Sequence, residues 1–278
     1  MMPARSLARP QVLLYLFLGL FALYSLFPVL WTLVTSFKPE SEAVAYPPQL
    51  VPASVTLANY VYVLTRTSVP LYIWNTFVVS GITVALVTGT SALAGYAFAR
   101  FKFHGRNLLL LGLLICVMVS GATKVIPLYL MLLQVGLLNS YWSLILTYSA
   151  ELIPLSVWLM KSYIDTIPTE LDEAALIDGS GKLHVFFTMI LPLSVPGIIA
   201  VALMTFVRAS QEFIYASTFI SEPTLKTAPV GLYVFFTDIG VQWGNLTAAS
   251  LLVVAPMIAI FLLLQRWFTS GLTVGAVK

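Results

Sequence analysis

Long apolar runs alternate with short polar segments along the whole of this 278-residue sequence. Six of the runs are long enough, at about 20 residues or more, to cross the hydrocarbon core of a bilayer as a helix. They predict membrane helices at about residues 12–36, 71–99, 107–132, 140–162, 193–220 and 246–268. We therefore expect an all-α, polytopic membrane protein in which residues 1–278 form a single transmembrane domain.

Two longer connections lie on one side of these helices. The first carries Pro47, Pro48 and Pro52 and is predicted to be irregular. The second follows the fifth helix and contains Glu222. Inside the second helix, Ser91 and Gly95 stand at the small-xxx-small spacing, which predicts that another helix approaches closely there.

The longest polar island lies within residues 164–192 and predicts two short helices. Thr169 and Asp172 are spaced as a capping box, which would begin the first helix. An apolar stripe is expected next, and Gly179 follows where a helix end favours a left-handed residue. The stripe residues are Leu171, Ala174 and Ala175.

The second helix of the island is predicted by apolar residues at i, i+3, i+4 and i+7, which place them on one face. We expect this helix to end where Pro192 interrupts the backbone hydrogen bonding. The stripe residues are Leu183, Phe186, Phe187 and Ile190. Such an amphipathic pair either docks against a soluble partner or lies at the membrane interface.

The composition agrees with a membrane protein, because 59% of the residues are apolar, 9% are charged and the mean hydropathy is +0.95. Soluble domains have about 25% charged residues. The net charge of +3 comes without a basic run, so nucleic acid is not an expected partner. A single cysteine, Cys116, excludes an internal disulfide and a four-cysteine metal site.

The distribution of Lys and Arg predicts the orientation, since cytoplasmic loops are enriched in these residues. Six crossings place both termini on one side, together with the polar island. Nine of the 14 basic residues then lie on that side, three lie outside and two lie in the membrane. The nine are Arg5, Arg9, Arg100, Lys102, Arg106, Lys161, Lys182, Arg266 and Lys278. Both termini and the island are therefore expected in the cytoplasm.

Two cations and two anions fall within predicted membrane helices, where each charge costs about 2.5–3.5 kcal/mol at a helix centre on insertion scales. They are Lys124, Glu151, Arg208 and Glu212, and Gln211 adjoins the last. Mutual pairing would satisfy them structurally. The functional interpretation is that these five residues line a polar translocation path.

Several motifs resemble the permease subunits of binding-protein-dependent ABC importers. Glu173-Ala174-Ala175, then Gly179, then Leu191-Pro192 is similar to their EAA signature. The segments SALAGYAFARFKFHGR, IPLYLMLLQVGLLNS and RWFTSGLTVGAVK are similar to the maltose-type carbohydrate-uptake branch. The resemblance covers nearly the whole chain.

The resemblance implies a subunit of the prokaryotic inner membrane that works with a second, homologous permease, an ATPase dimer and an external solute-binding protein. The island would be a cytoplasmic coupling loop docked on the ATPase. The coupling residues would be Leu171, Glu173, Ala174, Ala175, Asp178, Gly179, Leu191 and Pro192. The tail, residues 270–278, would also reach the ATPase through Gly271, Gly275 and Lys278.

ATP and Mg would be bound by the partner ATPase subunits, and this chain would hold no cofactor, metal or catalytic residue. The segment Gly179-Ser180-Gly181-Lys182 ends like a phosphate-binding loop, but Leu183 stands where Ser or Thr is needed. The chain is therefore expected to be a transport subunit and not an enzyme.

The implied solute is a sugar, a di- or oligosaccharide, with glycerol phosphate or another polyol derivative as the alternative. A secondary transporter would show inverted repeats and helices broken at the midplane. A membrane enzyme would need a cluster of nucleophile, base or metal ligands at one face. Neither pattern is clear in the sequence.

Overall fold

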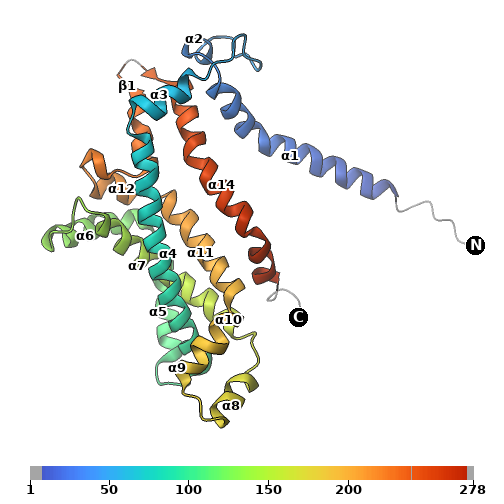
Figure 1. The fold of residues 1–278 in the computed structure, drawn as a ribbon, viewed down its shortest axis with the longest axis vertical. Coiled ribbons are helices and arrows are strands. Elements are labelled where there is room, and N and C mark those ends of the chain that lie inside the picture. Colours follow the sequence, from blue (N-terminus) through green and yellow to red (C-terminus); the bar gives the residue numbers. More distant parts are fainter. Residues whose placement is uncertain (1–7, 239, 274–278) are drawn as a thin grey trace, which may run out of the picture. The chain divides into compact units, whose positions relative to one another are not determined.

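The computed structural model describes the backbone of residues 8–238 and 240–273, and the side chains of residues 13–238 and 240–264. Its helices are drawn in Figure 1. The described chain divides into two compact units. Unit 1 contains the residues up to Ser68 and Leu232–Val254, and unit 2 contains Val69–Gly231 and the residues from Ala255 onward.

Unit 1 combines an N-terminal segment with the segment Leu232–Val254. Its elements are α1 (Ala8–Ser36), α2 (Glu40–Ala43), α3 (Ala58–Arg66), the 3-10 helix η3 (Leu232–Phe235), the antiparallel strands β1 (Phe236–Thr237) and β2 (Gly240–Val241), and the start of α14 (Trp243–Thr273). The buried amide of Asn59 donates hydrogen bonds to the carbonyls of Ser36 and Lys38, at 2.9 and 2.8 Å. The Glu40 carboxylate accepts the first N–H groups of α14, from Trp243 and Gly244.

Unit 2 is built on α4 (Val69–Arg100), α7 (Tyr141–Ile164) and α11 (Val195–Ser210), which pack against one another. Its other elements are α5 (Arg106–Met118), α6 (Gly121–Gln134), α8 (Glu170–Ile177), α9 (Lys182–Val185), the π-helix η1 (Phe186–Ile190), α10 (Leu191–Leu193), α12 (Ile214–Phe219), η2 (Pro223–Leu225) and α13 (Ala228–Gly231). Ser91 and Gly95 are buried in α4, and Gly95 lies against α7. The predicted close approach of helices is confirmed.

Four described helices are long and apolar enough to cross a membrane: Leu13–Ser36, Val69–Arg100, Tyr141–Ile164 and Trp243–Leu264. Two bent pairs bring the number of spans to six if each pair is counted as one. The pair Arg106–Met118 and Gly121–Gln134 bends by 99°, and the pair Lys182–Leu193 and Val195–Ser210 bends by 74°. The all-α, multi-pass fold is confirmed.

Two of the predicted membrane helices, the third and the fifth, were expected to be continuous, but each is interrupted in the structure. The third helix is interrupted because Val119 has an extended backbone and Ser120 is also non-helical, with ψ of 119° and 138°. The fifth helix stops at Ser210 and restarts as α12 at Ile214. The Glu212 carboxylate binds the N–H groups of Tyr215 and Ala216, so this segment begins a new helix.

Candidate functional site

The polar island predicted to be a coupling loop, residues 164–192, is called the coupling loop below; it contains α8, α9, η1 and α10, and α8 and α9 lie beyond the C-terminal end of α4 (Figure 1). Gly179 ends α8 with φ of +83°, as predicted. The N–H of Gly179 binds the Leu176 carbonyl, and the N–H of Ser180 binds the Ala175 carbonyl. These two bonds form a Schellman motif, which stops the helix sharply and reverses the chain.

The predicted capping box is wrong. Thr169 makes no side-chain cap, and Asp172 is directed elsewhere. The Asp172 carboxylate accepts hydrogen bonds from Arg100 Nε at 2.8 Å and from the Tyr96 hydroxyl at 3.3 Å. An ion pair with a buried guanidinium is a stronger interaction than a cap on one backbone N–H, so it determines the orientation of Asp172.

The predicted apolar stripe of α8 is only partly correct. Ala175 is buried and Leu171 is half-buried in unit 2, but Ala174 is exposed. Since Asp172 occupies part of the inward face, the inward stripe is rotated from the one expected. The exposed face of α8 carries Glu173, Ala174, Leu176 and Ile177, with Asp178 also exposed after it.

The second helix of the loop departs further from the prediction. Phe186 and Ile190 are buried as expected, but Leu183 is 68% exposed and Phe187 is 56% exposed. The reason is the π-helix at Phe186–Ile190, whose wider turn breaks the 3.6-residue spacing. Pro192 does not end the segment, because it lies in the first turn of α10, where its missing N–H is tolerated.

A cavity of about 610 Å³, lined by both charged and apolar residues, lies between α6, α7, α11 and α12 in unit 2. It brings together all five residues that the sequence placed on a translocation path: Lys124, Glu151, Arg208, Gln211 and Glu212. Lys124 Nζ lies 3.8 Å from Glu151 Oε1, which is an ion pair without a normal hydrogen-bond length. Tyr148 and Tyr215 also line the cavity and were missed, because tyrosines in an apolar run resemble ordinary core residues.

Glu212 and Arg208 differ in how they are satisfied. Glu212 accepts hydrogen bonds from the Tyr148 hydroxyl at 2.8 Å and from the N–H groups of Tyr215 and Ala216 at 2.9 and 3.1 Å. Arg208 has no hydrogen bond or ion pair within the described part of the chain, and its side chain is exposed. The role of the cavity in transport stays a prediction.

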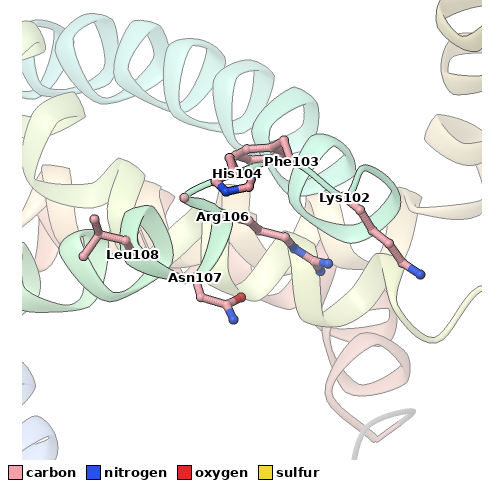
Figure 2. Close-up of a pocket in the computed structure, with 7 residues that line it drawn as sticks. Lys102, Phe103, His104, Arg106, Asn107 and Leu108 are labelled. Carbon is pink, nitrogen blue, oxygen red and sulfur yellow. The ribbon is translucent and has the colours of Figure 1, made fainter.

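A second hollow of about 480 Å³ surrounds the basic turn between α4 and α5 (Figure 2). One continuous segment, Lys102 to Leu108, lines it. Arg106 Nε is buried there and has no hydrogen-bond partner among the described residues. No cluster of His, Cys, Asp and Glu in the described chain could hold a metal ion.

The predicted tail contact falls mostly outside the described residues, which end at Thr273. Gly275 and Lys278 lie outside them. Gly271 lies within α14, because this helix extends beyond its predicted end at residue 268. The contact of the tail with the ATPase stays a prediction.

The family described as binding-protein-dependent transport system inner membrane component matches residues 6–274. The chain belongs to this family. The trehalose/maltose transport system permease protein MalG of Thermococcus litoralis is 35% identical over 271 residues, covering 96% of this chain and 97% of that protein. The galactooligosaccharides transport system permease protein GanQ of Bacillus subtilis is 35% identical over 268 residues, covering 95% and 94%.

A solved structure supports the same fold. A chain of a bacterial ABC transporter involved in the import of the acidic polysaccharide alginate superposes with a TM-score of 0.84 at 18% identity, covering 96% of this chain and 99% of that one. The resemblance seen in the EAA-like motif is confirmed, and the protein is a multi-pass membrane permease of a binding-protein-dependent system.

Proposed function

We propose that this permease carries a sugar, a di- or oligosaccharide, by alternating access with a homologous partner permease, driven by ATPase subunits. The observation that carries the proposal is the family match over residues 6–274 in a chain whose coupling loop exposes several apolar side chains. ATP and Mg are bound by the ATPase subunits, so this chain takes part in coupling and not in hydrolysis.

The exposed face of the coupling loop supports docking on an ATPase. Ile177 is 85% exposed, and Leu176, Leu183 and Phe187 are also exposed, although α8 and α9 are polar around them. Apolar groups gathered on a polar element are typical of protein interfaces. We assign the ATPase contact to this outward face with Glu173 and Ala174, while Ala175 and Leu171 anchor α8 from within.

The cytoplasmic side is assigned from the basic residues near the coupling loop. Arg100, Lys102, Arg106, Lys161 and Lys182 all lie in or beside the connections at this end of α4, α5, α7 and α9. Cytoplasmic connections are enriched in Lys and Arg. The coupling loop and both termini are thus assigned to the cytoplasm, and an external solute-binding protein delivers the solute on the opposite side.

The sugar assignment rests on the names of the relatives, which transport trehalose or maltose and galactooligosaccharides. The cavity beside α11 provides groups suited to hydroxyl-rich solutes, since Arg208 and Gln211 are exposed hydrogen-bonding side chains there. We assign the translocation path to this cavity.

The proposal is tested by purifying the chain with its neighbouring subunits and reconstituting the complex in liposomes. We expect the ATPase to copurify and uptake of a sugar to require ATP and the binding protein, whose ligand is identified by a screen of saccharides and polyol phosphates. Uptake by the purified chain alone, without an ATPase, would contradict the proposal. A polyol phosphate as ligand would contradict the sugar assignment only.

A further inference from the structure

A buried ion pair joins the coupling loop to a membrane helix. Arg100 is the last residue of α4, and its Nε lies 2.8 Å from Asp172 Oδ2 in α8. The two side chains are only 8% and 12% exposed. The Nη2 group of Arg100 also donates to the Ile167 carbonyl at 2.8 Å, just before α8 begins. The Arg100 guanidinium thus binds both α8, through Asp172, and the segment that leads into α8, through Ile167.

Aromatic and aliphatic side chains surround most of this pair. Tyr96 lies one turn before Arg100, and its hydroxyl donates to Asp172 Oδ1. The Tyr96 ring lies tilted by 42° against Phe186 of η1, with 5.1 Å between the ring centroids, and meets Phe101 edge-on with 5.7 Å between centroids. Ile167, Ala175 and Val185 belong to the same buried cluster. Electrostatic attraction is stronger in such a low-dielectric site than in water.

Two other ion pairs occur in the described chain, and neither is both buried and in contact with the coupling loop. Lys161 and Asp165 stand at i and i+4 on one helix, and the Asp165 side chain is 40% exposed. Lys124 and Glu151 are partly exposed and 3.8 Å apart. Within the described residues, the Arg100 pair is therefore the buried ion pair that links the coupling loop to the bundle.

We propose that Arg100 and Asp172 are positioning residues that fix the coupling loop to α4, so that a displacement of α8 moves α4 as well. Helix α4 packs along α7 and α11, and these two helices contribute Tyr148, Glu151 and Arg208 to the lining of the cavity described above. The ion pair is the first link of a packed connection from the coupling loop to that cavity. This inference rests on the proposed function.

The test uses the full complex with Cys116→Ala and a spin label on Glu170→Cys, an exposed position of α8 outside the face assigned to the ATPase. The variants are Arg100→Met, Asp172→Asn and the exchange Arg100→Asp with Asp172→Arg. Lys161→Met is the matched control, because it removes a cation from an exposed pair. Label mobility and solute taken up per ATP hydrolysed are measured, with ATPase copurification as the check on assembly.

We expect Arg100→Met and Asp172→Asn to raise label mobility and to lower uptake per ATP by about tenfold, while the ATPase still copurifies. The exchange variant should return label mobility and uptake per ATP most of the way to the values of the unmodified complex. The Lys161→Met control should resemble the unmodified complex in both. Unchanged mobility and uptake per ATP in both single variants would overturn the inference. An assembled exchange variant that restores neither would also overturn it.

The two hypotheses fail in different ways. If the unmodified chain brought down no ATPase, the proposed function would fail, while label mobility would still report whether Arg100 holds α8. If the ATPase is present and uptake depends on ATP, but the Arg100 variants keep normal mobility, only the positioning role fails. Should Arg100→Met not assemble, Asp172→Asn and the exchange still decide the outcome.

Discussion

Gly95 of α4 lies directly against Met160 of α7: a β-carbon on Gly95 would stand 2.7 Å from Met160 Cβ and 2.9 Å from the Lys161 nitrogen. The two helices therefore meet backbone to backbone. Gly95→Val should force them apart and lower the unfolding free energy by about 1–3 kcal/mol, as overpacking does. Thermal unfolding of the purified complex in detergent measures this loss.

Gly89 on the same helix is the matched control, because a β-carbon there would meet nothing within 4 Å. Gly89→Ala should leave the unfolding temperature unchanged or raise it slightly. Equal losses for both variants would contradict a specific effect of the contact with α7, because helix propensity favours Ala over Gly.

Gly179 provides a test of the loop geometry. Its φ of +83° disfavours a side chain, so Gly179→Val should strain the turn by about 1–2 kcal/mol and misplace α9 relative to α8. We expect membrane insertion to persist and uptake per ATP to fall. Gly181→Ala is the control, since Gly181 has φ of −73° and open space around it. Normal uptake per ATP in Gly179→Val at normal expression would count against the coupling role.

Ile177 tests the outward face of α8. Replacing this exposed side chain by Glu should leave the fold intact, because nothing in unit 2 buries it, but should weaken an apolar contact with the ATPase. Copurification of the ATPase should fall about tenfold, as for a central interface residue. Ile177→Leu, which keeps the apolar surface, should copurify normally. Equal recovery of the ATPase with both variants would place the docking face elsewhere.

Glu212 and Arg208 line one cavity but should respond differently to substitution. Glu212→Ala leaves the N–H groups of Tyr215 and Ala216 without their acceptor, which should cost about 1–3 kcal/mol of unfolding free energy. Glu212→Gln keeps a side-chain carbonyl and should lose less.

Arg208→Gln, in contrast, removes a charge that has no partner in the described chain, so stability should be retained while uptake falls. Chemical or thermal unfolding and uptake per folded complex separate the two effects. A loss of stability in Arg208→Gln with unchanged uptake would assign this residue a structural role.

Features set by local sequence were predictable. The apolar runs located the spans, the small residues Ser91 and Gly95 located a close helix contact, and Gly179 located the turn. Each depends on neighbouring residues or on a backbone preference that one residue type satisfies. The EAA-like motif added the family, which the match over residues 6–274 confirms.

The failures arose from partners far away in sequence. Asp172 was assigned to a cap on its own helix, but its partner Arg100 lies 72 residues earlier. The outward face of the loop followed from that contact and from the π-helix, and neither leaves a mark in the 3.6-residue pattern. The new helix at Ile214 depends on Glu212, which caps its first N–H groups. In the sequence alone, Glu212 is only a charge within a predicted membrane helix.

The bond from Glu40 to the start of α14 spans more than 200 residues of chain, at separations of 203 and 204. A growing polypeptide leaves the ribosome from its N-terminus, so this carboxylate emerges early and must wait for the last helix to be synthesised and inserted. Unit 1 can therefore complete its folding only after the start of α14 has been synthesised. A product that stops before Trp243 would leave the Glu40 carboxylate without these two N–H donors, so unit 1 would stay unformed.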